Sequence, residues 1–424
     1  MTAHLIDPFA SAQRHLSRSL AFVQRLNGAG ALEVEAFGAE VTLSDGRVLV
    51  DFGSYAVTLF GHRHPMVISS VMDALGTMPT STRVFANGRT IAFAERLVES
   101  VGCPSLSRVW FGTNGSDVVE AALKLARIST GRTYIAAVTG AYHGKSLGAL
   151  GATYSAFYRP MPLPEILPPT IFLDPLDPSA LRHAAKTVDF AAVIVEPVQG
   201  ESGVHPLSVE VLDSWRRDAA SLGTFFIADE VQSGLGRCGP MSIAVAEKLN
   251  PDAVLFGKAL GGGVLPLSAA VMTEELFAPL QRDPFIHSLT FGGHPMCVAA
   301  GDGALNAWNH ERPQFNDIQS ALTDTLRAVR ELHPALVTAT RQRGLMAAIE
   351  LSSVDSAGET LVALAHHGLI VSPCLGSPAT LRLLPSLVTT DEQARRARQA
   401  VLAALADAKE IRSLNRESET SCPS

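Results

Sequence analysis

Short apolar runs recur between residues 109 and 256 and predict buried β-strands. They cover residues 109–111, 134–138, 191–195, 225–228 and 253–256. The stretches between them carry apolar residues at helical spacing, and in residues 117–127 an apolar face lies opposite a polar pair of Glu120 and Lys124. Because strands alternate with helices, the pattern favours an α/β fold with a mostly parallel sheet covered by helices.

The pattern changes after about residue 308, where charged, helix-forming sequence becomes common. Predicted helices and short strands there cover residues 319–332, 391–408, 345–351 and 380–384. This texture predicts a second, smaller α/β domain. Near the other end of the chain, residues 41–52 predict a hairpin around an Asp-Gly turn. We therefore expect an N-terminal segment that packs with the small domain, a large domain and a small C-terminal domain, at residues 1–50, 51–310 and 311–424.

The composition indicates a large globular protein that binds small molecules. The 424 residues are 47% hydrophobic, which is enough to bury a sizeable core. The net charge of −7 comes without any long run of Lys or Arg. That balance argues against a nucleic-acid binder, which needs a basic surface.

The cysteines and the N-terminal sequence predict a cytoplasmic protein. The five cysteines form no C-x-x-C pair and do not cluster with His at metal-ligand spacing, so we expect reduced thiols and no metal. Arg14, Arg18 and Arg25 interrupt the apolar positions of the first thirty residues, so we expect no signal peptide. Residues 253–272 are almost wholly apolar, yet they contain Lys258 and three consecutive glycines, and we expect a buried strand with a tight loop rather than a membrane span.

Lys258 is the only one of the six lysines that lies within an apolar run. Burial lowers the pKa of an ammonium group, as an amine nucleophile requires, although a strand-end lysine can also extend its head group to solvent. Asp229 follows the predicted strand of residues 225–228, and Lys258 follows the next predicted strand, residues 253–256. Since the carboxyl ends of parallel strands meet at one sheet edge, the two side chains can converge. An Asp and a Lys placed so match a pyridoxal phosphate site, in which Asp pairs with the pyridinium nitrogen and Lys with the aldehyde.

A phosphate-binding loop and a ring contact fit the same site. The string TNGSD, residues 113–117, lies between a predicted strand and a predicted helix. There Gly115 and Ser116 offer backbone N–H groups and a hydroxyl to a phosphate, although Ser at a helix start is also common for structural reasons. Tyr142 follows the next strand and can lie flat on a planar ring, with ordinary packing as the alternative.

A competing motif is GLGRCG at residues 234–239, which satisfies the G-x-G-x-x-G pattern of an NAD-binding site. Such a site needs an acidic residue at the end of the following strand, and Asp252 comes at its start. An NAD-dependent oxidoreductase is therefore the less favoured interpretation.

From about Gly38 to Ala404, the sequence resembles the class III pyridoxal-phosphate aminotransferases, which include the ornithine, acetylornithine, putrescine and 4-aminobutyrate enzymes. The strings that match, in family order, are VDFGSYAVTLFGHRHP, TNGSDVVEAALKLAR, AYHGKSLGALG, IVEPVQGESG, FFIADEVQSGLGRCG, LFGKALGGGVLPLSA, HSLTFGGHP and LRLLPSL. The resemblance implies fold type I, with a large domain built on a mostly parallel sheet of the seven-stranded type and a smaller α/β C-terminal domain. It also implies a homodimer with a shared active site.

The resemblance also implies the roles of individual residues. Lys258 is expected to form the Schiff base with pyridoxal phosphate and Asp229 to hold the pyridinium proton. The other expected cofactor-binding residues are Gly115, Ser116, Tyr142, His143, Glu196, Val231, Gln232 and Thr290, the last reaching the phosphate of the neighbouring subunit.

The substrate-binding residues implied by the resemblance are Tyr55, Glu201 and Arg382. Arg382 matches the arginine that pairs with the carboxylate of glutamate or its keto acid, and Glu201 matches an acid that neutralises this arginine. The implied activity is ping-pong transfer of an amino group between an ω-amine, diamine or ω-amino acid and a keto acid or aldehyde, with 2-oxoglutarate and glutamate as one pair. A racemase or aminomutase on the same scaffold stays an alternative, and such an enzyme needs no keto-acid acceptor.

Overall fold

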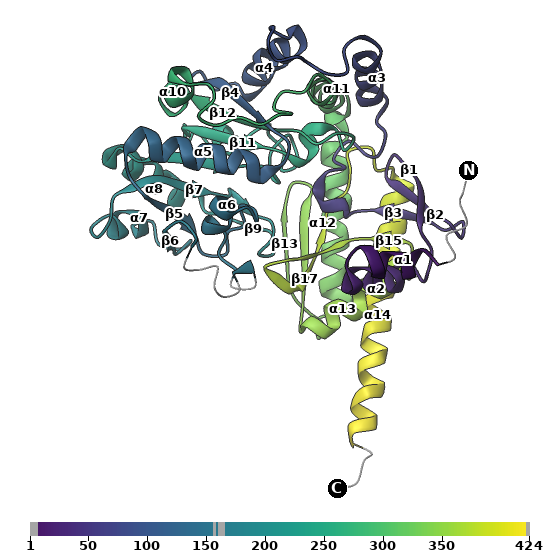
Figure 1. Ribbon diagram of the computed structural model, residues 1–424. Helices are drawn as coiled ribbons and strands as arrows, with labels where there is room; N and C mark the ends of the chain where they lie inside the picture. Colours follow the sequence, from purple (N-terminus) through teal and green to yellow (C-terminus); the bar gives the residue numbers. More distant parts are fainter. Residues whose placement is uncertain (1–6, 156–157, 160–165, 421–424) are drawn as a thin grey trace.

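The computed structural model describes residues 7–155, 158–159 and 166–420. Its largest sheet has seven strands in the order β4-β12-β11-β10-β7-β5-β6 (Figure 1). These strands are β4 (Leu106–Gly112), β5 (Tyr134–Val138), β6 (Thr170–Leu173), β7 (Phe190–Val195), β10 (Phe225–Asp229), β11 (Ala253–Phe256) and β12 (Ser268–Thr273). β12 runs antiparallel to both neighbours, and the other pairs are parallel. The predicted α/β fold with a mostly parallel sheet is confirmed.

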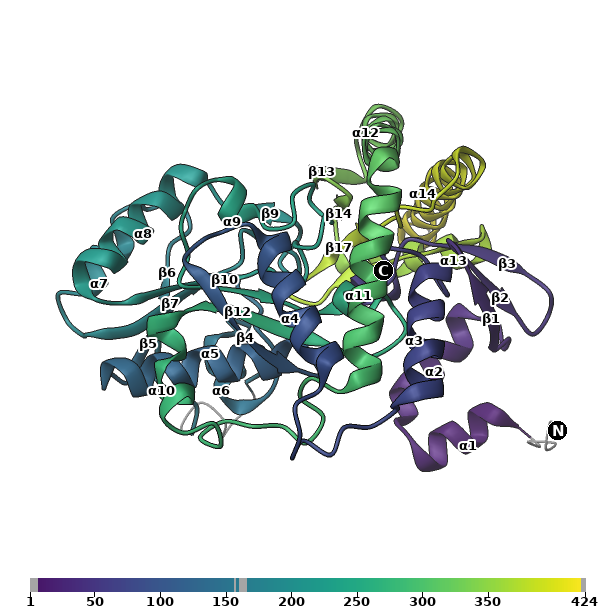
Figure 2. The same ribbon diagram turned by 90° about the horizontal axis from the view of Figure 1, so that it is seen from above.

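Helices cover both faces of this sheet (Figure 2). On one face pack α5 (Gly115–Thr130) and α10 (Glu274–Arg282), and on the other α4 (Gly88–Val101) and α8 (Val209–Leu222). Along β10, Phe226 and Ala228 join the core with α8, whereas Ile227 joins the core with α5. All residues of β7 and β10 are buried, which explains why these strands are continuous apolar runs in the sequence.

Shorter elements connect the large sheet to its surroundings. They are α6 (Leu147–Ala152), α7 (Ala180–Ala184), α9 (Ile243–Ala246), the short turns η1 (Ser54–Ala56) and η4 (Lys258–Gly261), and the two-stranded pair β8 (Val198–Gln199) and β9 (His205–Pro206). Two longer helices, α3 (Pro65–Thr77) and α11 (Pro295–Glu311), pack against each other.

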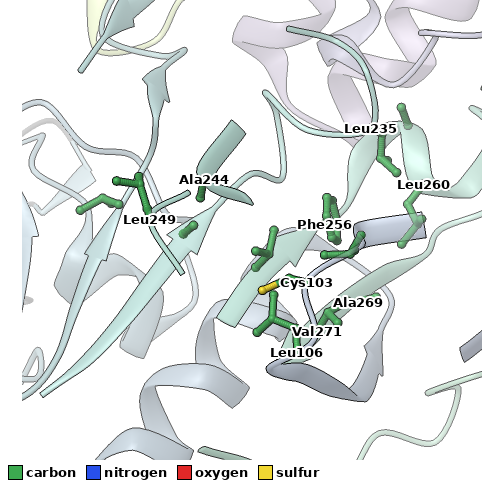
Figure 3. Packing of buried hydrophobic residues seen from close by; sticks show 14 of the residues in the cluster. Cys103, Leu106, Leu235, Ala244, Leu249, Phe256, Leu260, Ala269 and Val271 are labelled. Atoms are coloured by element: carbon green, nitrogen blue, oxygen red, sulfur yellow. The ribbon is translucent and has the colours of Figure 1, made fainter. Parts of the chain in front are cut away.

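The loops that follow β10 and β11 are anchored in the hydrophobic core (Figure 3). Leu235 comes from the loop after β10, and Phe256 and Leu260 lie on either side of Lys258 in the sequence. All three side chains are buried in one cluster. This anchoring fixes both loops at the edge of the sheet, and with them the positions of Asp229 and Lys258.

A second sheet, β13-β14-β17-β16, is antiparallel throughout. Its strands and the helices beside it are β13 (Val337–Arg343), β14 (Met346–Leu351), β16 (Ser372–Cys374), β17 (Ser377–Leu383), α12 (Phe315–Leu332), α13 (Val354–His366) and α14 (Asp391–Thr420). Apart from β16, these elements share one hydrophobic core, which Val50 and Phe52 join from the N-terminal part of the chain. The last part of α14 extends away from the body of the molecule (Figure 1).

A third sheet joins the N-terminal part of the chain to this C-terminal region. Its order is β1-β2-β3-β15, and β15 pairs in parallel with β3. The elements are α1 (Pro8–His15), α2 (Arg18–Asn27), β1 (Glu33–Phe37), β2 (Glu40–Leu43), β3 (Val48–Asp51) and β15 (Leu369–Ile370). The predicted hairpin is the antiparallel pair of β2 and β3. The division of the chain at residues 50 and 310 stays a prediction.

The apolar stretch of residues 253–272 forms β11, η4 and the first part of β12. β12 itself was not predicted, because its apolar residues merge with those of β11 in the sequence. β6 was not predicted either, and only Leu173 of its residues is fully buried. Among the residues that the structure describes, no helix is long and apolar enough to cross a membrane.

The predicted polar pair of Glu120 and Lys124 does not form. Glu120 instead accepts hydrogen bonds at Oε1 from the backbone N–H groups of Gly148, at 2.7 Å, and Ala149, at 3.1 Å. These N–H groups belong to the first turn of α6, which has no intrahelical partner for them. Capping a helix outweighs an exposed ion pair, which stabilises a protein by only about 0–1 kcal/mol.

Candidate active site

A cavity of about 220 Å³ lies at the carboxyl ends of the parallel strands. Its walls include the predicted residues Gly115, Ser116, Tyr142, His143, Glu196, Asp229, Val231, Gln232 and Lys258. Each of them lies at or just after the end of a strand of the large sheet, or at the start of α5. The structure therefore brings together residues that are up to 143 positions apart in the sequence. Asn114 and Gly144 also line the cavity, and sequence reasoning did not assign them a role although both lie in the strings it used.

Lys258 begins η4, directly after the one glycine that separates it from β11. Its backbone has a φ of +45°, a left-handed conformation that is uncommon outside glycine. Burial lowers the pKa of the Lys258 ammonium from 10.5 to about 8, with Glu201 acting in the opposite direction. A larger share of this amine is therefore neutral near physiological pH than for a solvated lysine, and the neutral form is the nucleophile.

Asp229 forms a buried pair with His143. The distance from Asp229 Oδ2 to His143 Nδ1 is 2.7 Å, and Asp229 Oδ1 accepts a hydrogen bond from the Val231 N–H at 3.1 Å. Burial acts to lower the pKa of His143, but the hydrogen bond and charge of Asp229 outweigh it and raise this pKa. Nε2 of His143 is buried and has no partner among the described residues. The bond to His143 holds the Asp229 carboxylate in a fixed orientation, in which it can accept the N–H of a pyridinium ring.

Glu196 also lines this cavity. Its Oε1 accepts a hydrogen bond from the Tyr142 N–H at 2.7 Å. This bond holds the backbone of Tyr142 in place. Burial raises the pKa of Glu196 from 4.5 to about 7, despite the opposing effect of His143. Burial likewise raises the pKa of Tyr142 to about 12, so its phenol stays neutral.

The first turn of α5 forms an anion-binding cradle. Asn114 and Asp117 cap the helix reciprocally, which holds its start in a defined conformation. A Cβ on Gly115 would lie 2.9 Å from Val231 Cγ1, and a Cβ on Gly144 would overlap the Ser116 hydroxyl. The two glycines therefore allow close approach, of Val231 to the start of α5 and of the Gly144 backbone to the Ser116 hydroxyl. A helix N-terminus attracts phosphate through its free N–H groups and dipole, so these residues fit the phosphate of pyridoxal phosphate.

Arg382 and Glu201 form a buried ion pair beside the cavity, with 2.7 Å between Arg382 Nη1 and Glu201 Oε1. Gln232 bonds to both of them. Burial acts to raise the pKa of Glu201, but the charges of Arg382 and Lys258 outweigh it and hold this pKa below its ordinary value. Of the two charges, Glu201 acts to raise the pKa of Lys258 and Arg382 acts to lower it.

Besides Glu201 and Arg382, two more predicted residues lie outside the cavity walls, Tyr55 and Thr290. Tyr55 is 69% exposed and belongs to η1, where Ser54, Tyr55 and Ala56 all have positive φ. η1 nevertheless packs against η4, which begins with Lys258. Thr290 is exposed, in the segment between α10 and α11. The roles of both residues stay predictions.

The glycine motif at residues 234–239 lies in turns and does not open a helix, because α9 begins only at Ile243. Leu235 is buried and a Cβ on Gly236 would overlap the Trp308 ring, so the motif packs closely against the core. A dinucleotide motif must lead directly into a helix, and the structure does not provide that context. Within the described part of the chain, no group of three or more His, Cys, Asp or Glu side chains could hold a metal ion.

Comparison with known proteins agrees with this geometry. The sequence model of the class III aminotransferases matches residues 27–405. Among solved structures, the ornithine aminotransferase from Toxoplasma gondii is 25% identical, with a TM-score of 0.84 over 95% of each chain. A pyridoxal-phosphate-bound amine transaminase from an uncultivated Pseudomonas species is also 25% identical, with a TM-score of 0.79 over 89% of this chain and 94% of that one. A transaminase from the marine bacterium Virgibacillus shares the fold at 22% identity and a TM-score of 0.83, over 94% of this chain and 99% of that one. The chain belongs to the class III aminotransferases, and its cofactor is pyridoxal phosphate.

Proposed function

We propose that this aminotransferase moves an amino group from an ω-amine, a diamine or an ω-amino acid to a keto acid, with 2-oxoglutarate and glutamate as one substrate pair. The observation that supports the keto acid is Arg382, a buried guanidinium beside the cavity whose ion-pair partner is a single carboxylate. Arginine binds a carboxylate through two parallel hydrogen bonds, which suits a dicarboxylic keto acid. The names of two structural neighbours, an ornithine aminotransferase and an amine transaminase, support the amine class.

The residues of the cavity divide the chemistry among them. When bound, pyridoxal phosphate supplies an aldehyde for the substrate nitrogen and a ring that withdraws electrons. Lys258 would hold the cofactor through its side-chain nitrogen and is the group that would take the proton from the substrate carbon as a general base. Asp229, braced by His143, holds the proton on the ring nitrogen. Gly115 and Ser116 would bind the phosphate, Tyr142 and Val231 would contact the ring, and Glu196 accepts a hydrogen bond from the Tyr142 N–H.

We also propose a homodimer. Large apolar side chains are exposed on two segments, with Val84 and Phe85 on one and Phe285 and Phe291 on the other. Arg83 ties the two segments together through its hydrogen bond to the Thr290 carbonyl at 3.2 Å. Exposed apolar groups that lie close together are typical of a protein interface. Thr290 lies in this region, as a residue that reaches the partner's phosphate must.

A cytoplasmic location stays a prediction.

Substitution of Arg382 by alanine tests the proposed acceptor. We expect KM for 2-oxoglutarate to rise on the order of a hundredfold, because two charge-assisted hydrogen bonds are lost. KM for an amine without a carboxylate should change little, and it serves as the internal control. The measurement is steady-state kinetics of both half-reactions with the purified protein. Equal changes in both KM values would contradict the role of Arg382, and turnover of the amine without any keto acid would point to a racemase or aminomutase.

The pKa of Lys258 predicts how the apoprotein captures its cofactor. Only the neutral amine attacks the aldehyde, so the rate of capture should rise with pH and level off above about pH 8, the pKa set mainly by burial. Stopped-flow absorbance after mixing apoprotein with pyridoxal phosphate measures this profile. A rate that keeps rising to pH 10, as a solvated lysine would give, would contradict the burial of this amine.

A further inference from the structure

Gln232 joins Glu201 and Arg382 into a closed set of three hydrogen bonds. Arg382 Nη1 donates to Glu201 Oε1 at 2.7 Å and to Gln232 Oε1 at 3.0 Å, and Gln232 Nε2 donates to the same Glu201 oxygen at 3.1 Å. All three side chains are buried. Gln232 alone of the three lines the cavity. Each of the two polar atoms of its amide makes one hydrogen bond to the ion pair.

The backbone is shaped to admit the Gln232 amide at this place. A Cβ on Gly200 would overlap the amide oxygen of Gln232. Gly200 directly precedes Glu201, so the glycine lets Gln232 approach the chain beside the carboxylate that it binds. Any larger residue at position 200 would push the amide away from Glu201.

Glu201 is also held from the C-terminal region of the protein. Its Oε2 accepts a hydrogen bond from the Leu375 N–H at 3.2 Å, and its carbonyl accepts one from the Gly376 N–H at 2.8 Å. Arg382, by contrast, has a buried Nε without a partner among the described residues. The guanidinium thus keeps donor capacity for a second carboxylate, whereas Glu201 is bound at both oxygens.

A substrate carboxylate that binds Arg382 through Nη1 competes with Glu201 for this donor. Gln232 bonds to both residues while the ion pair is closed, and it loses at least its bond to Glu201 when the pair opens. Each hydrogen bond that exists only while Glu201 and Arg382 are paired lowers the fraction of protein molecules in which this ion pair is open. The apparent dissociation constant for a carboxylate rises by the same factor.

We propose that Gln232 is a specificity-determining residue that holds Glu201 against Arg382, so that the site accepts carboxylate-free amines and admits a carboxylate at a cost in affinity. This inference rests on the proposed function, in which Arg382 binds the keto acid. It assigns to Gln232 a role toward the substrate in addition to its expected contact with the cofactor.

Binding of glutarate tests this role without any turnover, because glutarate has two carboxylates but no carbonyl to accept an amino group. Titration calorimetry compares the cofactor-loaded wild type with Gln232→Leu, which keeps the size of the side chain and removes its amide. We expect glutarate to bind the variant about tenfold more tightly, the effect of losing roughly one hydrogen bond to a charged group. Ser233→Ala is the matched control, since Ser233 is the next residue, is buried, and has a hydroxyl without a partner among the described residues. It should bind glutarate like the wild type.

A second variant, Gly200→Ala, should act in the same direction because its Cβ displaces the Gln232 amide. KM for a carboxylate-free amine should not fall in either variant, which separates a change in selectivity from a general loosening of the site. Unchanged or weaker glutarate binding in both variants would overturn the proposal. So would an Arg382→Ala variant that binds glutarate as the wild type does, since the carboxylate would then bind elsewhere. Tighter glutarate binding without any amino transfer would instead count against the proposed function alone.

Discussion

Replacement of Lys258 by alanine should abolish amino transfer, lowering kcat by at least about 10⁴-fold, because both the nucleophile and the general base are lost. The variant should still bind pyridoxal phosphate through the α5 cradle and the Asp229 carboxylate, but without a covalent link. Its absorption spectrum should therefore resemble that of the free aldehyde. Lys186→Ala, which removes an exposed lysine, is the matched control and should keep full activity.

The same variant should not lose stability as apoprotein. Burial holds the pKa of Lys258 at about 8, below the 10.5 of an unfolded chain. The unfolded state then binds more protons between these values, so stability rises with pH through this window, and below pH 8 the buried ammonium destabilises the fold. Removing it should leave the melting temperature at pH 7 equal or higher. Residual amino transfer with a normal spectrum, or a collapse of the fold, would contradict the assignment of Lys258.

The second large effect is expected at Asp229. Asp229→Asn keeps the shape of the side chain but removes the charge that holds a proton on the ring nitrogen, so kcat should fall by about 10²- to 10⁴-fold. The substitution also removes the charge that raises the pKa of His143. Steady-state and single-turnover kinetics with the cofactor-loaded variant measure the effect.

Glu230 provides the matched control for Asp229. It is the adjacent carboxylate and is also buried, but it accepts hydrogen bonds from the Ser242 hydroxyl at 2.6 Å and the Ile243 N–H at 2.7 Å, where it caps α9. Glu230→Gln should lower the melting temperature and leave kcat nearly unchanged. A near-normal rate in Asp229→Asn, or equal losses of rate in both variants, would remove Asp229 from the chemistry.

The convergence of Asp229 and Lys258 could be predicted because it depends on local rules. Each residue follows a strongly apolar strand, and neighbouring parallel strands place their carboxyl ends together; in the structure Asp229 lies in register with Leu255 of β11. The phosphate cradle could be predicted for the same reason, since a strand that leads into a capped helix is visible in the residues of TNGSD.

Contacts between distant segments could not be predicted from the residues alone. His143 and Asp229 are 86 positions apart, and the hydrogen bond between them depends on the order of β5, β7 and β10 in the sheet. The closed set of bonds around Gln232 depends on a third segment, β17, which brings Arg382 to the site. Sequence reasoning placed Gln232 near the cofactor through family resemblance, but only the structure shows that its amide is bound to the ion pair.

The left-handed turn of η1 is a similar case. Ser54, Tyr55 and Ala56 carry positive φ angles, although none is a glycine and the local sequence gives no signal for it. Asp51 lies just before this turn and accepts hydrogen bonds from the Gly53 N–H at 2.9 Å and from His62 Nε2 at 2.9 Å. The bond to His62 joins the chain before the turn to a segment after it, a contact that the local sequence does not reveal.

One measurement tests the central claim directly. The protein loaded with pyridoxal phosphate is treated with borohydride, which makes a Schiff base permanent, then digested and analysed by mass spectrometry. The pyridoxyl phosphate mass should appear on the peptide that contains Lys258, and the other five lysines serve as internal controls within the same sample. A label on Lys145 or on any lysine other than Lys258, or no label on a protein that transfers amino groups, would contradict the site described above.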